Sequence, residues 1–498
     1  MEEYRQLIIV LCVAAYMLLS IGVGIWAIRR TKSAHDFFVA GRSLGPLVVG
    51  MAVFSSTLSG FGFVGGPGLV YNSGLSSVWM VCVISLGYAL AFFLVAKRIR
   101  MMAELHDTVS LPDVLAARYG SEGVRFLTAL TILLGVFGYL ATQILAMALV
   151  LQSILSQMVI FVDISLVTCT VISLSVLVFY SVTGGIVASV YTDLVQGLVM
   201  MVAGVLVVYT AATVYDGGLA EVSQVIFERD PEAIMPFGTL GMVVSLSWFF
   251  MFGFGLAAQP HIVTKFMMSK NIRDNRTILP LSVLGFAISA MLWISIGIVM
   301  HAVVMDGLLT PLDAADKAAP VFLSVYANPL LAGVVFAGLF AAIMSTADAF
   351  LNIGAAAVVH DIPKAIRGRA PKNELRWARY ATFLIAVVAA LFALYSYYFG
   401  GQLVAILGAF GWGMFAASLM PLVVIGLNWK RATRAGAVTS IGVAILINLW
   451  VQLLSVSLPY GMVGGFVAML VSMIVFIVVS LLTPENVLPK DIDQVMDI

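Results

Sequence analysis

Hydrophobic residues in this chain form long continuous runs that are separated by short polar segments. The runs near residues 7–27, 76–96 and 463–482 reach the roughly 20 apolar residues that one helix needs to cross a bilayer core of about 30 Å. Apolar and polar residues do not alternate along these runs, so the pattern predicts helices rather than the strands of a barrel. We therefore expect an all-α membrane protein.

The same pattern, followed along the whole chain, predicts thirteen membrane-spanning helices. They are expected near residues 6–27, 45–72, 76–96, 124–157, 160–181, 188–213, 239–267, 278–303, 325–357, 378–398, 402–427, 435–456 and 462–483. The first run lacks the basic flank of a secretory signal and is long enough to span, so we expect it to be retained.

Composition supports the membrane assignment. The chain is 62% hydrophobic and only 10% charged, against roughly 25% charged residues in a soluble domain. Such a chain cannot cover a water-facing surface, so we expect a multi-pass protein of the cell (cytoplasmic or inner) membrane, surrounded by the lipid bilayer. It has no basic, aromatic-interleaved soluble stretch that would favour nucleic acid as a partner.

The basic residues predict the orientation. If the segments between spans are assigned alternately to the two sides, all but three of the 26 Lys and Arg residues fall on one side, Lys265 among them. The three exceptions are Arg5, Arg229 and Lys317. Basic loops face the cytoplasm, so the N-terminus is expected outside and the C-terminus inside.

Two spans contain sequences that should interrupt a helix. Residues 54–68 are dense in glycine and hydroxyl side chains, and residues 252–260 repeat the theme five spans later. Glycines also allow close packing of helices in lipid, which is the alternative interpretation of each span alone. Broken helices in corresponding positions of two oppositely directed halves instead indicate a transporter built from inverted repeats.

This organisation predicts five segments. They are an extra N-terminal helix and cytoplasmic loop (1–44), a first repeat (45–213), an extracellular loop (214–238), a second repeat (239–427), and two C-terminal helices with a cytoplasmic tail (428–498).

Asp193 and Asp348 lie deep inside long apolar segments. A bare charge at bilayer depth costs several kcal/mol unless something pairs with it, so these carboxylates indicate a cation or proton pathway. Ser345 and Thr346 lie within one helical turn of Asp348 and add the oxygen atoms that hard cations prefer. The alternatives are that Asp193 caps a helix near its inner end and that the hydroxyls bond to their own backbone.

Other chemistry finds little support in the sequence. The five histidines are far apart and do not form the inward pairs that haem or two metals would need. The sequence has no phosphate-binding loop, nucleophile elbow or segment long enough for an ATPase domain, so we expect no enzyme and an ion gradient as the energy source. Gln259-Pro260-His261 is interpreted as a structural turn.

Several motifs resemble one family of membrane transporters. They are Gly41-Arg42-Ser43-Leu44-Gly45-Pro46, Ser59-Gly60-Phe61 with Gly65-Gly66-Pro67-Gly68, Thr183-Gly184-Gly185 followed by Tyr191-Thr192-Asp193, Gln259-Pro260-His261, and Ala342-Ile343-Met344-Ser345-Thr346. In order and spacing, from about residue 30 to 435, they resemble the sodium:solute symporter family, which includes transporters of proline, pantothenate, sialic acid, monocarboxylates and glucose.

The resemblance implies a leucine-transporter-type fold, a five-plus-five inverted repeat with one helix before it and two after it. It also implies a sodium site made of the backbone carbonyls of Ser55, Leu58 and Ala342 and the hydroxyls of Ser345 and Thr346. Some members hold a second sodium, and here that site would use Asp193, Ser345 and Asp348, where a proton could replace sodium.

The resemblance places the solute in a mostly apolar cavity between the broken helices. The positions that would line it are Thr57, Phe61, Tyr139, Gln143, Phe252, Leu256 and Trp412. Proline transporters carry an acid, a Trp and a Tyr where this chain has Thr57, Phe252 and Leu256, which argues against proline. A small carboxylate or amino acid fits best, its carboxylate meeting the amides of a half-helix N-terminus. The aromatic residues equally suit ordinary helix packing.

We therefore expect a secondary active symporter that imports a small organic solute with sodium by alternating access. Sodium is the coupling ion and no prosthetic group is expected, and a monomer is expected to suffice. One alternative is a proton-coupled carrier on the same scaffold, with Asp193 and Asp348 as the relay. Another is a sensor or channel that binds a solute without concentrating it.

Overall fold

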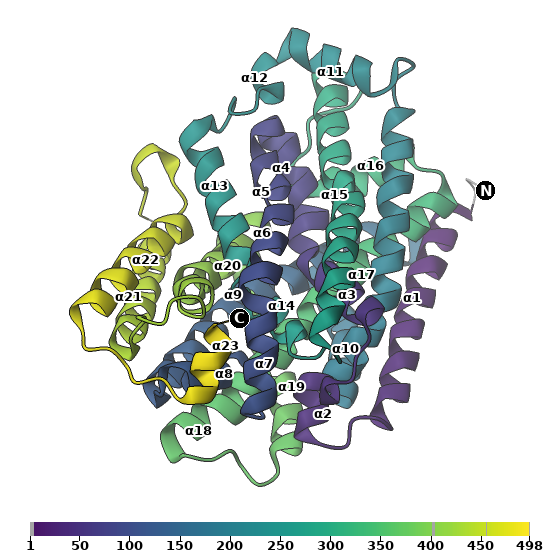
Figure 1. The fold of residues 1–498 in the computed structure, drawn as a ribbon. Helices are drawn as coiled ribbons and strands as arrows, with labels where there is room; N and C mark the ends of the chain where they lie inside the picture. Colours follow the sequence, from purple (N-terminus) through teal and green to yellow (C-terminus); the bar gives the residue numbers. More distant parts are fainter. Residues whose placement is uncertain (1–3, 401–403, 455, 498) are drawn as a thin grey trace.

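The computed structural model describes residues 4–400, 404–454 and 456–497. Within these ranges the chain forms helices, together with a single isolated parallel bridge between Leu44 and Ser269 (Figure 1). The helices are α1 Arg5–Ile28, α2 Ala34–Val39, α3 Pro46–Thr57, α4 Gly66–Ser73, α5 Trp79–Cys82, α6 Ile84–Leu90, α7 Lys97–Leu105, α8 Leu111–Tyr119, α9 Glu122–Leu155, α10 Leu166–Ala212, α11 Gly218–Arg229, α12 Pro231–Ile234, α13 Gly241–Leu256, α14 Pro260–Phe266, α15 Asn275–Met305, α16 Ala318–Tyr326, α17 Pro329–Ala356, α18 Ile362–Arg367, α19 Glu374–Tyr395, α20 Val404–Met420, α21 Arg434–Leu453, α22 Gly464–Leu482 and α23 Lys490–Met496. The described residues thus confirm the all-α prediction.

Eleven helical stretches in the described ranges are long and apolar enough to cross a membrane. Two of them are interrupted by a glycine with a positive φ, Gly74 in the stretch Phe61–Leu105 and Gly185 in α10. If both stretches are divided at these glycines, and α3 is joined to α4 across the first break, the helical stretches match the thirteen predicted spans in order. Residues 402–403 of the predicted span 402–427 lie outside the described residues. The number of membrane crossings remains a prediction.

Gly185 reverses the direction of the chain inside α10. An unbroken helix of 47 residues would be about 70 Å long, more than twice the thickness of a bilayer core. Gly185 has φ 53° and ψ −145°, values that a residue with a side chain rarely adopts. A Cβ at this position would also lie 2.5 Å from the ring of Phe37. The hydroxyl of Thr31 donates to the carbonyl of Gly184 at 2.8 Å and ties the turn to the chain that follows α1.

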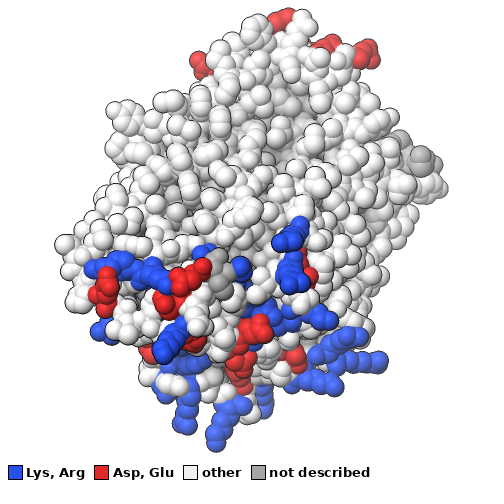
Figure 2. All heavy atoms as spheres, viewed as in Figure 1, with Lys and Arg blue, Asp and Glu red and all other residues white. Residues whose placement is uncertain are grey.

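Charged side chains lie at the two ends of the molecule on the face shown in Figure 2, where acidic and basic side chains are mixed at the lower end. Figure 2 shows Lys and Arg gathered at the lower end, near α2, α8, α18 and α23, below a broad belt without charges. On this face the upper end carries only acidic side chains. The separation agrees with the side assignment made from the sequence, while the orientation of the termini in a membrane stays a prediction.

Both predicted helix breaks are present. The first helix stops at Thr57 and Leu58 is extended, with φ −84° and ψ 112°; the chain then resumes through a π-helical turn, Phe61–Gly65, into α4. The second helix stops at Leu256, and Gln259 is extended, with φ −64° and ψ 118°, before α14 begins at Pro260. Of the predicted turn Gln259-Pro260-His261, only Gln259 lies in the break, because Pro260 and His261 begin α14.

Glycines beyond the first break allow close packing of helices. The glycine-rich stretch 54–68 therefore contains both a helix break and packing glycines, at different residues. A Cβ on Gly66 in α4 would lie 2.2 Å from the indole of Trp293 in α15. On the opposite helix, a Cβ on Gly297 would lie 2.4 Å from Val70. α4 and α15 therefore approach more closely than any side chain at these two positions would allow.

Candidate cation and solute site

Oxygen atoms from the first helix break and from α17 meet at Thr346. Its hydroxyl oxygen lies 3.1 Å from the carbonyl oxygen of Ser56, 3.3 Å from that of Ala342 and 3.5 Å from that of Leu58. Thr346 is fully buried, and its single O–H can donate to only one of these acceptors. A buried hydroxyl facing three carbonyls is the kind of oxygen set that a hard cation takes.

Ser345 turns its hydroxyl to a neighbouring group of oxygens. It donates to Oδ1 of Asp193 at 2.5 Å, and it lies 3.1 Å from Oγ of Ser55 and 3.2 Å from Oγ of Ser56. The structure thus brings the predicted sodium ligands together, but in two groups: Thr346 faces backbone carbonyls, and Ser345 faces Asp193 and two serine hydroxyls. Thr346 contacts the carbonyl of Ser56 rather than that of Ser55, whose hydroxyl faces Ser345. The carbonyl of Ser55 as a sodium ligand stays a prediction.

Lys265 is a part of this site that the sequence analysis missed. The basic-residue pattern places it on the inner side, yet its side chain is 1% exposed and that of its partner Asp193 is 0% exposed. The ammonium donates to Oδ2 of Asp193 at 2.6 Å, to the carbonyl of Ala52 at 2.9 Å and to the hydroxyl of Ser56. One signal was available: Lys265 falls inside the predicted span 239–267, one turn and a half beyond the break.

Asp348 takes its hydrogen bond from a residue outside this ion pair. Oδ1 accepts a hydrogen bond from Ser189 of α10 at 2.7 Å. The other oxygen, Oδ2, is buried and has no hydrogen-bond partner among the described residues. Asp193 lies within the second part of α10 and is paired with Lys265, so it is not the helix-capping carboxylate of the alternative interpretation.

Five of the seven predicted solute residues line one small cavity of about 20 Å³. They are Thr57, Phe61, Tyr139, Phe252 and Trp412. The ring of Phe61 stacks on Phe252, with centroids 5.7 Å apart, and meets Trp293 edge to face at 5.6 Å. A volume of this size suits a water molecule rather than an organic solute, so the side chains fill the space in this conformation.

The other two predicted solute residues do not line the cavity. Gln143 accepts a hydrogen bond from the backbone N–H of Gly60 at 2.7 Å through Oε1 and so fixes the break itself. Leu256 is buried against Gly87, and a Cβ added at Gly87 would lie 2.8 Å from the side chain of Leu256. Both side chains therefore contact neighbouring segments and do not belong to the cavity lining.

Trp293 lines the cavity and was not predicted. Its indole N–H is buried and has no partner in the described part of the chain, and the same holds for the side-chain nitrogen of Gln143. Of the two, only Trp293 lines the cavity, so its indole N–H is the free donor that a solute there could engage. An isolated Trp inside an uninterrupted apolar span carries no sequence signal that would separate it from ordinary packing residues.

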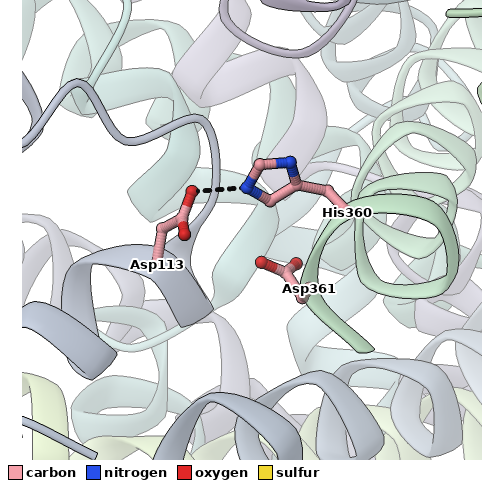
Figure 3. Close-up of side chains that lie close together, drawn as sticks. All are labelled: Asp113, His360 and Asp361. Carbon is pink, nitrogen blue, oxygen red and sulfur yellow. Dashed lines mark hydrogen bonds and ion pairs between the residues drawn. The ribbon is translucent and has the colours of Figure 1, made fainter. Parts of the chain in front are cut away.

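A second buried cluster lies at the charged end of the molecule. Figure 3 shows the imidazole of His360 pointing at Asp113, with Asp361 beside them. The three residues are close enough to hold a metal ion, their ligand atoms lying within 4.8 Å of one another. However, Oδ1 of Asp113 already accepts from Arg125 and, at 2.9 Å, from Lys364, and Oδ2 faces His360 Nε2 at 2.8 Å. These cations make the cluster an ion-pair network rather than a metal centre.

The network joins α8 to the chain beyond α17. The other ring nitrogen of His360 lies 2.6 Å from a carboxylate oxygen of Glu374, so the imidazole stands between two acidic groups. Burial by itself raises the pKa of Asp113, but the hydrogen bond and charge of His360 and the charge of Arg125 outweigh it and hold that pKa well below its ordinary value. Asp113 is therefore ionised at every physiological pH.

Similar proteins share this architecture along nearly the whole chain. A structure titled as the substrate-bound, outward-open state of a Na⁺-coupled sialic acid symporter matches with a TM-score of 0.79 and 20% identity, covering 97% of this chain and 99% of that one. Mhp1, a nucleobase-cation-symport-1 family transporter in a closed conformation, matches with a TM-score of 0.59 and 17% identity, over 93% and 98%. With two broken helices around buried oxygens, the fold is that of the leucine-transporter-type secondary transporters.

Sequence comparison narrows the class to one family. The sequence model of the sodium:solute symporter family matches residues 37–444, and the chain belongs to that family. The osmoregulated proline transporter OpuE of Bacillus subtilis (strain 168) is 26% identical over 490 residues, 95% of each chain. A sodium/proline symporter of Staphylococcus aureus (strain JH9) is 27% identical over 507 residues, 98% of this chain and 95% of that protein. The chain is thus a multi-pass membrane transporter that couples sodium to a small solute, and not an enzyme.

Proposed function

We propose that this protein imports a small carboxylate or amino acid by alternating access, driven by sodium bound between the first broken helix and α17. The observation that carries the proposal is the position of Thr346, whose hydroxyl faces the carbonyl oxygen of Ser56 in the last turn of α3 and that of Leu58 at the break. The proposed ligands are the carbonyls of Ser55, Leu58 and Ala342 and the hydroxyls of Ser345 and Thr346.

Sodium at these oxygens would link the first broken helix to α17, which lies far away in the sequence. Leu58 lines the solute cavity and is followed three residues later by Phe61, which also lines it. An ion that fixes the carbonyl of Leu58 would therefore fix one wall of the cavity. Solute binding would in turn hold Leu58 in place for the ion, and each ligand must strengthen the other by the same factor.

The character of the cavity supports a solute with an apolar body and few polar groups. Its walls are mostly aromatic or aliphatic, and the buried indole N–H of Trp293 is free to donate. A buried donor without a partner suits a solute that brings a hydrogen-bond acceptor, such as a carboxylate. The relatives named for proline and the structural neighbour named for sialic acid also take up carboxylates, which supports this class without selecting a member of it.

One observation favours a second candidate, a proton-coupled carrier on the same scaffold. Oδ2 of Asp348 is buried without a partner among the described residues, so this oxygen is free to take a proton. In this version a proton on Asp348 would travel with the solute in place of sodium. The proposed setting is the same for both candidates: the cell (cytoplasmic or inner) membrane, a functional monomer in lipid, and repeats over residues 45–213 and 239–427.

Purified protein reconstituted into vesicles tests the proposal. A thermal-shift screen against small carboxylates, amino acids and sugars, each with sodium or with choline as the only cation, first identifies the solute, because a ligand that binds only the native state raises its apparent stability. Labelled solute should then accumulate against its gradient when sodium is high outside. Uptake that needs only an imposed pH gradient would favour the proton-coupled carrier, and equilibration without accumulation would contradict both.

A further inference from the structure

The ammonium group of Lys265 stands beside the carboxylate expected to hold a second coupling ion. The resemblance to known symporters places such an ion at Asp193, Ser345 and Asp348. In the structure both carboxylate oxygens of Asp193 are engaged, Oδ1 by Ser345 at 2.5 Å and Oδ2 by Lys265 at 2.6 Å. The predicted second site therefore already contains a positive charge, and it belongs to the protein.

The surroundings of Lys265 match an ammonium ion in number and kind. A protonated lysine has three N–H donors, and three acceptors lie within hydrogen-bond distance: the carboxylate of Asp193, the carbonyl of Ala52 and the hydroxyl of Ser56. The ion pair is completely buried. No water is needed to complete the coordination of the lysine, so the charge is fully compensated in place.

Lys265 also connects the elements that a second ion would connect. It extends from α14, the half-helix beyond the second break. Its acceptors lie on α3, before the first break, and on the second part of α10. The side chain thus crosses from the second repeat to two helices of the first, much as a metal ion between them would.

We propose that Lys265 is a built-in cation that replaces a second coupling ion, so that the protein binds a single sodium, at the oxygens around Thr346. This inference rests on the proposed sodium site. A second sodium at Asp193 would have to displace the ammonium from Oδ2 or share the carboxylate with a like charge. Without the lysine, the oxygens of Asp193, Ala52, Ser55, Ser56 and Ser345 would be left facing one another, and this set suits a hard cation.

The test counts sodium ions, and sodium alone is the probe. Binding of radioactive sodium to purified full-length protein in lipid nanodiscs is measured to saturation and divided by the amount of protein. Wild type should bind one sodium per chain. Lys265→Met should bind two, a twofold rise at saturation, and the double variant Lys265→Met with Asp193→Asn should return to one. Lys270→Met removes an exposed lysine five positions further along and should bind one.

The outcomes separate this inference from the proposed function. Two sodium ions in wild type, or one in a folded Lys265→Met protein, would overturn the built-in cation while leaving sodium coupling intact. No sodium in wild type would overturn the proposed sodium site and the inference with it. Gel filtration monitors folding, and Lys265→Gln, which keeps two N–H donors without the charge, replaces the Met variant if the latter does not fold. The wild-type count stands as a test whichever variant is recovered.

Discussion

The hydroxyl oxygen of Thr346 lies 3.5 Å from the carbonyl oxygen of Leu58, although the two residues are 288 positions apart in the sequence. One belongs to an unbroken helix and the other to the point where a helix stops. The carbonyl of Leu58 has no partner within its own helix among the described residues, so a small ion bound to it and to Thr346 would fix the position of the first broken helix relative to α17.

Thr346→Val tests this contact because it removes the hydroxyl and keeps the shape of the side chain. The sodium concentration for half-maximal uptake should rise by about tenfold or more, which corresponds to roughly 1.4 kcal/mol of lost binding free energy. Thr382→Val is the matched control, since Thr382 is equally buried and bonds only to the carbonyl of Ala378 in its own helix. Equal sodium dependence in the two variants would contradict the proposed site.

Trp293→Phe tests whether the free indole N–H meets the solute. The phenyl ring keeps most of the contact with Phe61 but has no donor, so the affinity for the solute should fall by about tenfold, the size of one net hydrogen bond of about 1–1.5 kcal/mol. Trp377→Phe, at an exposed position, should leave the affinity unchanged. The thermal shift produced by the solute measures both variants, and an unchanged shift in Trp293→Phe would remove this residue from the solute site.

Gly66→Ala tests the close approach of α4 and α15. The added methyl group would lie 2.2 Å from the indole of Trp293, so the helices must separate or the ring must turn, at a cost of about 1–3 kcal/mol. We expect a lower Tm and weaker transport. Gly22→Ala adds the same methyl group in α1, where nothing lies within 4 Å, and should not lower the Tm. Equal Tm values for the two variants would show that the contact between Gly66 and Trp293 can widen without a loss of stability.

Asp113→Asn tests the ion-pair network at the charged end. The change leaves Arg125 and Lys364 without their shared carboxylate, and the loss of one partner from a buried pair costs about 3 kcal/mol. Because the pKa of Asp113 is depressed in the folded protein, its contribution to stability is present above the unfolded pKa of about 3.9 and is lost as the pH falls further, towards the folded value.

The Tm of Asp113→Asn should accordingly lie below that of wild type by a constant amount from pH 8 down to about pH 5, and the two should approach each other below about pH 4. Asp163→Asn removes an exposed carboxylate and should follow the wild-type curve. A difference that is the same at pH 3.5 as at pH 7 would show that the charge of Asp113 is not what stabilises the network.

Local composition was enough to predict the helix breaks. Glycine and hydroxyl side chains around residue 58, and glycine before Pro260, lower the local helix propensity, and the chain leaves the helix at both places. The hydroxyl pair on α17 could be predicted too, because two polar residues beside a carboxylate stand out in an apolar span. These features depend on neighbours in sequence.

What the sequence did not predict depends on contacts between distant segments. The partner of Asp193 could not be named, because Lys265 reaches it only once α14 has packed beneath α3. Similarly, Trp293 reaches the cavity only because Gly66 lets α15 approach the first broken helix. Gln143 and Leu256 do not line the cavity for the same reason, because Gln143 contacts Gly60 and Leu256 contacts Gly87 once the helices have packed; their role in solute binding stays a prediction.

The reversal of α10 at Gly185 has a mechanical consequence. The two arms meet with no loop between them, and both hold α17: Tyr180 donates to the carbonyl of Met344 from one arm, and Ser189 donates to Asp348 from the other. α17 cannot tilt away from one arm without straining the other, so the three segments should swing as a single rigid body whenever the transporter changes the side to which it opens.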